Sequence, residues 1–292
     1  MMNALRGRSP AFWIFLIAAA ILVGAVSLSI HVVMLQGLGV PFPDRGGVTI
    51  WPRLLDSSLA SLALIAFYAL AQPRLSGVAP WIRVLIVALL YAMLKEVARG
   101  AAMGGIVTTA YLFNAAQALI PILHCIAVAI LVVAITPLLR GPVAKLLGAL
   151  GISALILFAI RPLIESVLGP WLQSISYLAH DDVYPFPYGA HVLFWAYVTY
   201  LEPLIACLII ALLVWPGLSA RAPLRIVQFV ALILLIKGSL IPTFLYGFYN
   251  ASGVPLGMLS ESQFLLETLA LALGVALIAQ FALSDGRARH RP

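Results

Sequence analysis

Seven ionisable side chains lie within long apolar stretches, where a charge is costly. They are Lys95, Arg99, His124, Arg161, Glu202, Lys237 and Glu267. A Lys, Arg or Asp at the centre of a bilayer helix costs roughly 2.5–3.5 kcal/mol on insertion scales, and such residues usually pair or contact water. Each of the seven is therefore a candidate ligand-binding residue.

The residue types favour binding of an anion over catalysis. Ammonium and guanidinium groups form strong charge-assisted hydrogen bonds with carboxylates and phosphates. We expect an anionic group to be held by the four cations, Lys95, Arg99, Arg161 and Lys237. Acidic and histidine side chains within spans serve transporters as proton relays. We expect counter-charges or proton carriers at the remaining three, His124, Glu202 and Glu267.

The segment from Lys95 to Arg99 permits two interpretations. Glu96 and Arg99 are three residues apart, so on one helix they would form a local pair that lowers the cost of insertion. Lys95 and Arg99 are four apart, so they would alternatively form an anion clamp. His31, Asp56 and Glu165 are expected at shallower depth, toward the outer ends of their helices.

Prolines near these residues predict interrupted helices. Pro162 follows Arg161, Pro203 follows Glu202, and Pro242 lies shortly after Lys237. Proline frees a carbonyl that neighbours or water must satisfy, and broken membrane helices often mark binding sites. We expect one cavity, open to the outside, to be lined by Lys95, Lys237, Arg161, Glu202 and His124.

Familiar catalytic and cofactor motifs are missing from the sequence. It has no H-E-x-x-H, G-x-S-x-G, Walker or dinucleotide-binding pattern, so an enzyme is not favoured and no cofactor is predicted. His180, Asp181 and Asp182 give only a weak metal signal, and we predict no metal site. Cys125 and Cys207 lie in apolar stretches without disulfide or metal spacing.

The elements that must position these side chains are membrane-spanning helices. Of the 292 residues, 63% are hydrophobic and 9% are charged, whereas soluble domains have roughly 25% charged residues. About 20 apolar residues cross a bilayer as a helix. The sequence therefore predicts an all-α integral membrane protein with eight spans and no soluble domain, near residues 11–36, 48–72, 81–103, 113–139, 146–168, 190–215, 224–248 and 263–284.

The net charge of +7 reports topology rather than a nucleic-acid partner. Lys and Arg are enriched in cytoplasmic loops. With eight spans, one side collects Arg6, Arg8, Arg74, Arg83, Arg140, Lys145, Arg221, Arg225, Arg287, Arg289 and Arg291. Both termini are therefore predicted to be cytoplasmic, and no nucleic-acid partner is expected.

Two similar stretches predict an internal duplication. Val40–Trp51 reads VPFPDRGGVTIW and Val183–Trp195 reads VYPFPYGAHVLFW, with the Pro-Phe-Pro triplets 144 residues apart. Arg83 precedes Lys95 by twelve residues, and Arg225 precedes Lys237 by the same number. We predict two four-helix repeats, 1–140 and 141–292. Because each has an even number of spans, they are parallel and related by an axis along the membrane normal.

Three functions remain open at this stage. The leading prediction is a multi-pass protein of the cell membrane, the inner membrane where a cell has two. It would be permease-like or solute-binding, with an outward-facing pocket for a small anionic solute. The alternatives are an outer-leaflet enzyme acting on a lipid-linked substrate, with Glu202 or Asp56 as base and His124 as acid, and a receptor or assembly subunit for another membrane protein. The lipid bilayer is an expected partner in all three.

Overall fold

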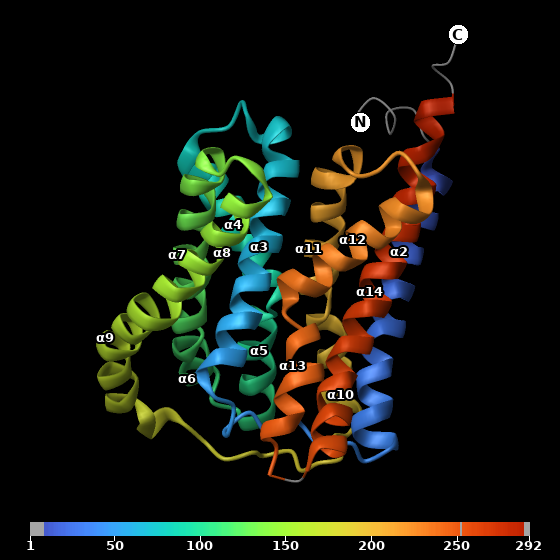
Figure 1. Ribbon diagram of the computed structural model, residues 1–292. Coiled ribbons are helices and arrows are strands. Elements are labelled where there is room, and N and C mark those ends of the chain that lie inside the picture. Colours follow the sequence, from blue (N-terminus) through green and yellow to red (C-terminus); the bar gives the residue numbers. More distant parts are fainter. Residues whose placement is uncertain (1–8, 252, 289–292) are drawn as a thin grey trace.

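The protein is a bundle of long helices that run mostly along one direction (Figure 1). The computed structural model describes residues 9–251 and 253–288, and within these ranges it contains helices and loops but no strand. Six of the described helices are long and apolar enough to cross a membrane, and a bent pair makes a seventh. The architecture is that of a multi-pass helical membrane protein.

The helices up to residue 138 are bounded as follows. They are α2 (Pro10–Val32), the π-helix η1 (Val33–Gly37), α3 (Ile50–Leu75), α4 (Pro80–Leu94), α5 (Val97–Thr108), α6 (Tyr111–Gln117), α7 (Leu119–Ile135) and the 3-10 turn η2 (Thr136–Leu138). The start of α2 follows from its sequence: Ser9 accepts a hydrogen bond from the Phe12 N–H, and Pro10 occupies the first turn.

The remaining helices run from residue 141 to residue 288. They are α8 (Gly141–Leu155), the π-helix η3 (Ile156–Ile160), α9 (Arg161–Ser174), η4 (Ser176–Leu178), α10 (Ala190–Thr199), α11 (Leu201–Val214), η5 (Trp215–Gly217), α12 (Ala222–Lys237), α13 (Leu240–Leu245), η6 (Tyr246–Tyr249) and α14 (Val254–Ala288). Regular α-helix is interrupted just before Pro162, Pro203 and Pro242, which confirms the three interruptions expected from the sequence.

Eight separate spans are not confirmed in the described part of the chain. The segment expected at 81–103 is divided between α4 and α5. Helix α4 has 15 residues, or about 22 Å at 1.5 Å per residue, which is shorter than a hydrocarbon core of about 30 Å. Helix α5 carries Arg99 and three glycines, and the break precedes it at Lys95 and Glu96. The supported number is six, or seven with the bent pair.

Two of the helices end at or just before a lysine that is followed by a residue with left-handed backbone conformation. Glu96, which follows Lys95, has φ +56°, and Gly238, which follows Lys237, has φ +67°. A residue in this conformation cannot continue a right-handed helix. The chain bends by 71° between α12 and the segment formed by α13 and η6. Both breaks leave carbonyls and charged side chains inside the bundle.

The two ends of the bundle differ in character. We call the end where α2 begins and α14 finishes the terminal end, and the opposite end, with loops 38–49 and 179–189, the loop end (Figure 1). The large apolar core lies toward the terminal end and includes the almost fully buried Phe67, Tyr68, Trp215 and Phe229. Several buried polar residues instead follow the half of α14 nearest the loop end, namely Ser260, Glu261, Gln263, Glu267 and Thr268.

Candidate functional site

The two helix breaks bring Lys95 and Lys237 together at the middle of the bundle. Lys95 Nζ donates a hydrogen bond of 2.8 Å to the Lys237 carbonyl oxygen. The last carbonyls of a helix have no partner within the helix, so the end of α12 supplies an acceptor. Lys95 Nζ also lies 5.7 Å from the centre of the Tyr91 ring.

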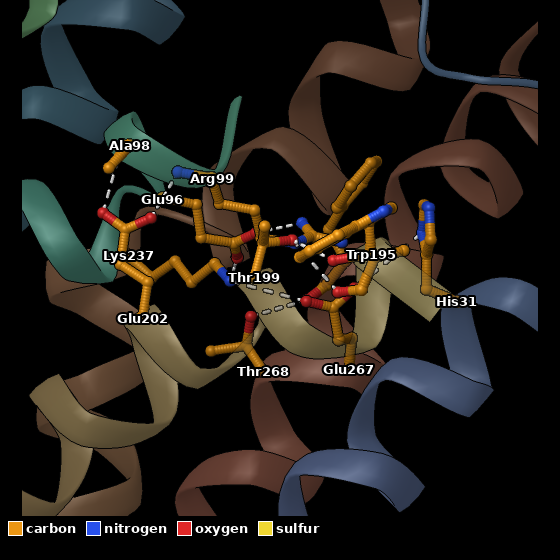
Figure 2. A network of polar contacts seen from close by, with 12 residues as sticks. His31, Glu96, Ala98, Arg99, Trp195, Thr199, Glu202, Lys237, Glu267 and Thr268 are labelled. Atoms are coloured by element: carbon orange, nitrogen blue, oxygen red, sulfur yellow. Dashed lines mark hydrogen bonds and ion pairs between the residues drawn. The ribbon is translucent and has the colours of Figure 1, made fainter. Parts of the chain in front are cut away.

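A buried ion network extends from the break in the first half of the chain to α14. Glu96 accepts hydrogen bonds from Arg99 Nη1 and Lys237 Nζ. Lys237 Nζ is 3.6 Å from Glu267 Oε1, and His31 Nδ1 is 3.8 Å from Glu267 Oε2. Figure 2 shows these side chains converging from several helices. We call Glu96, Arg99, Lys237, Glu267 and His31 the ion network.

The charges of this network balance when His31 is neutral. Two carboxylates face two cations, and Glu267 is 1% exposed. The Arg99 guanidinium carbon also lies 5.3 Å from the centre of the Tyr200 ring. Removing one partner of a buried pair is strongly destabilising because the other charge remains buried. The network therefore joins α2, α5, α12 and α14 into one electrostatic unit.

Glu202 serves a different purpose, because it binds the backbone of a neighbouring helix. Its carboxylate accepts hydrogen bonds from the N–H groups of Ala98, at 3.1 Å, and Arg99, at 2.5 Å (Figure 2). These N–H groups belong to the first turn of α5. The N-cap residue Glu96 does not accept a hydrogen bond from them with its own side chain. A negative charge at a helix N-terminus is also favoured by the helix dipole. Glu202 thus fixes α11 to the start of α5.

A cavity of about 630 Å³, which we call the basic cavity, opens among α3, α4, α7 and α9. Its charged or ionisable lining comprises Arg45, Arg53, Asp56, Lys95, His124 and Arg161. One wall is apolar and includes Ile120, Pro121, Leu157 and Ile164.

The cations of the basic cavity are only partly neutralised. Arg45 forms a two-pronged hydrogen bond with Glu261, at 2.7 and 2.6 Å, and Arg161 pairs with Glu165 at 2.7 Å. Burial by itself lowers the pKa of Arg45, but the hydrogen bonds and charge of Glu261 outweigh it and raise the pKa above its ordinary value. Four cations therefore face three carboxylates, which leaves a surplus positive charge.

Of the further cavities beside the ion network, two hold residues from both halves of the chain. The central cavity, of about 420 Å³, is lined by residues of both breaks, including Lys95, Glu96, Lys237 and Gly238, and shares Arg45 and Asp56 with the basic cavity. The His31 cavity, of about 350 Å³, lies among α2, α5 and α10 and reaches Asp182 of the loop end. It shares Phe42 and Phe264 with the central cavity.

The structure distributes the predicted site residues among these features. Lys95, His124 and Arg161 line the basic cavity, and Lys95 and Lys237 line the central cavity. Arg99 lines the His31 cavity. Glu267 lies in the ion network and Glu202 caps α5, and neither lines the basic, central or His31 cavity. Glu96 pairs locally with Arg99, whereas Lys95 and Arg99 line different cavities.

Three residues at the site were not selected from the sequence. Arg45 lies in a loop, and Arg53 and Glu261 lie near the beginnings of their helices, where charged residues are common in membrane proteins. One available signal was the Pro-Phe-Pro corner, because Arg45 lies two residues after Pro43. No sequence feature pairs Arg45 with Glu261, which lies 216 residues away.

No cluster of three or more His, Cys, Asp or Glu side chains that would suit a metal ion is present among the described residues. Comparison of the chain with protein-family models, with curated proteins and with solved structures finds no match. The functional argument therefore depends on the cavities and the ion network themselves.

Proposed function

We propose that this protein is a permease-like or solute-binding membrane protein that holds a small anionic solute in polar cavities facing the outside of the cell. The basic cavity carries this proposal: four cations line about 630 Å³ and face three carboxylates, Asp56 in the lining and the partners Glu261 and Glu165, so one positive charge is in surplus. Uncompensated cations in a membrane protein are costly. An anionic ligand would neutralise them.

The availability of Lys95 strengthens this assignment. Its ammonium group has three donors, and the carbonyl of Lys237 accepts from one of them. Lys95 lines both the basic and the central cavity, so its other donors can reach a ligand in either. An anion bound here would also lie next to the backbone of the α12 break.

Matching local structures support the proposed duplication. Each lysine at a break is followed by a left-handed residue, Glu96 or Gly238. Arg83 donates to the carbonyls of Ser76 and Val78, and Arg225 donates to those of Ser219 and Ala220. Both arginines thus bind the loop that precedes their own helix, at corresponding places in the two halves.

Helix packing supports the same relation. A rotation that exchanges the halves would exchange α3 with α11, α4 with α12, and α7 with α14. Under this exchange, the pair α4–α7 corresponds to α12–α14. The pair α3–α12 corresponds to α11–α4, and the pair α3–α7 corresponds to α11–α14. All six of these helix pairs are in contact. The central cavity shares lining residues with both the basic cavity and the His31 cavity. Parallel repeats in transporters place substrates at such an interface.

An enzyme acting at the outer leaflet is the second candidate, because Asp56 and His124 both line the basic cavity. A carboxylate and an imidazole sharing a cavity are the pair that general acid–base chemistry uses. This candidate predicts that a bound ligand is consumed by the wild-type protein. Asp56→Asn would then bind the ligand and leave it unchanged. A permease predicts movement of an unaltered solute across the membrane.

Thermal stability of the purified protein in detergent tests the proposal. We expect inorganic phosphate, sulfate or a small carboxylate to raise the melting temperature of the wild type. Arg53→Gln should raise about tenfold the anion concentration needed for the same shift in melting temperature, because it removes one charge-assisted hydrogen bond. Arg140→Gln is the matched control, because Arg140 is exposed at the terminal end. The proposal would be contradicted if none of these anions raised the melting temperature. It would also be contradicted if Arg140→Gln weakened the response as much as Arg53→Gln. Uptake by proteoliposomes then separates transport from binding.

A further inference from the structure

Helix α9 leaves one side of the basic cavity open to the surroundings of the bundle. After the π-helix η3, α9 diverges from the other helices (Figure 1). It packs against α7 and α6, and none of its residues is buried. By contrast, α8, which precedes η3, packs extensively on α3. The cavity wall between α3 and α9 is therefore not closed by helix packing.

The exposed surface of α9 combines apolar side chains with one ion pair. Leu163 is 63% and Val167 is 64% exposed, as expected of side chains that contact acyl chains. On the same helix, Arg161 and Glu165 are 45% and 47% exposed and form an ion pair four residues apart. A charged pair on a lipid-facing helix is costly unless it contacts water or another polar group. A polar group at the mouth of the basic cavity would provide that contact.

The lining of the cavity is itself amphipathic. Arg45, Arg53 and Lys95 come from the side of α3 and α4 and the loop before α3. Apolar residues come from α7, η3 and α9, which also contribute His124 and Arg161: Ile120, Leu157 and Ile164. A soluble anion needs the cationic wall but gains little from the apolar one. An amphiphile uses both, with its anionic head on the arginines and its chains along α7 and α9.

From this geometry we infer that the ligand of the basic cavity is an amphiphile whose phosphate headgroup has a net negative charge, and that it enters sideways from the bilayer between α3 and α9. This inference depends on the proposed binding of an anion and adds the source of that anion. Phosphate suits the site because arginines bind its oxygens with two parallel hydrogen bonds. The volume of about 630 Å³ accommodates a headgroup while the chains remain in lipid.

Native mass spectrometry of the full-length protein tests the inference with matched lipids. Dioleoyl phosphatidic acid and dioleoyl phosphatidylcholine have the same chains, and inorganic phosphate has none. We expect retention of phosphatidic acid about tenfold or more above phosphatidylcholine. Arg161→Gln combined with Glu165→Gln should reduce that retention about tenfold, and Arg140→Gln should not. The double change removes the pair together, so no unpaired charge remains.

A change in the apolar wall separates the lipid from a soluble anion. Ile164→Trp places a large side chain in the cavity lining, whereas Leu163→Trp places one on the exposed face of the same helix. We expect Ile164→Trp to abolish binding of phosphatidic acid while the melting-temperature response to inorganic phosphate persists. Leu163→Trp should leave both unchanged.

The outcomes distinguish this inference from the proposed function. Binding of inorganic phosphate as tight as that of phosphatidic acid, unaffected by Ile164→Trp, would leave an anion site and overturn the lipid inference. Equal retention of phosphatidylcholine, whose headgroup is zwitterionic, would also overturn it, because the site would then not select a net negative charge. If neither phosphatidic acid nor inorganic phosphate bound, the anion site and the lipid inference would both be excluded.

Discussion

Lys237 lies between two buried carboxylates and thereby determines the charge balance at the centre of the molecule. It bonds to Glu96 and lies 3.6 Å from Glu267. Glu96 has Arg99 as a second cationic partner, whereas Lys237 is the one Lys or Arg within 4 Å of the Glu267 carboxylate among the described residues. Loss of Lys237 would therefore affect Glu267 more than Glu96.

We predict that Lys237→Met lowers the free energy of unfolding by roughly 3–5 kcal/mol, because Glu267 keeps a buried charge without its cation. Lys237→Met combined with Glu267→Gln should recover much of this loss. Lys237→Met combined with Glu202→Gln is the matched control and should not recover it, since Glu202 binds the backbone of α5 instead. Thermal unfolding in detergent measures all four proteins. Equal recovery by the two double variants would contradict the assignment of partners.

At the scale of residues, the sequence shows which ionisable side chains lie in apolar segments, but it does not show what they contact. The depth of Lys95, Lys237 and Glu267 follows from counting along apolar helices, and these residues do lie at the centre of the bundle. The partner of Lys237 does not follow from counting, because it depends on which helix faces which. Glu202 shows this most clearly: its partners are backbone N–H groups, which every residue but proline has.

At the scale of elements, helix α5 depends on a charge supplied by another helix. We predict that Glu202→Ala destabilises the protein by about 1–2 kcal/mol, the usual cost of losing an N-cap side chain. Hydrogen exchange at the Ala98 and Arg99 amides should accelerate, because Glu202 accepts from both. Glu165→Ala is the control, as Glu165 is half exposed and pairs only with its neighbour on α9. Unchanged exchange in the first turn of α5 would refute the capping role.

The break after α12 requires a glycine. Gly238 has φ +67°, and a Cβ there would lie 2.9 and 3.0 Å from the Asp56 carboxylate oxygens and 3.0 Å from Lys95 Nζ. Left-handed backbone costs other residues about 1–2 kcal/mol, and the contacts add to this. We predict that Gly238→Ala lowers the melting temperature, whereas Gly151→Ala, inside α8 with nothing within 4 Å of the added Cβ, maintains or raises it. A neutral Gly238→Ala would show that the break can rearrange.

The breaks also explain why the number of spans was not fully predictable. Three interruptions were predictable from Pro162, Pro203 and Pro242, because proline removes a helix hydrogen bond. Nothing comparable precedes the break at Glu96, whose left-handed conformation is unusual for a glutamate. That conformation is accompanied by a distant contact, since Lys237, which is 141 residues away in the sequence, binds the Glu96 side chain. Tertiary structure thus divides a segment that its apolar composition marks as continuous.

At the scale of the whole molecule, cavities and core occupy opposite ends. The apolar core fills the bundle toward the terminal end, and the three cavities and the ion network lie between its middle and the loop end. Under the proposed function, this arrangement would give a ligand access from one side of a membrane and leave a packed barrier toward the other. Movement of a solute across the membrane would therefore require the core between the halves to separate.

Which side the cavities face is decided by whether α4 and α5 together cross the membrane. Loops 76–79 and 179–189 are separated by α4–α5, α6–α7 and α8–α9. Because α6–α7 and α8–α9 belong to candidate membrane spans, the two loops lie on opposite sides only if α4–α5 crosses as well. The positive-inside rule assigns the arginine-rich terminal end to the cytoplasm. The same alternation places residues 44 and 181 on one side of the membrane and residues 76 and 220 on the other.

We predict that Asp44→Cys and Asp181→Cys react with a membrane-impermeant maleimide in intact cells, whereas Ser76→Cys and Ala220→Cys react only after permeabilisation. All four positions are exposed in loops, so reactivity depends on the side of the membrane and not on burial. The unsubstituted protein is the control, because its own Cys125 and Cys207 are buried. Labelling of Ser76→Cys and Asp181→Cys from the same side would mean that α4–α5 re-enters without crossing, and the parallel four-helix repeats would then be excluded.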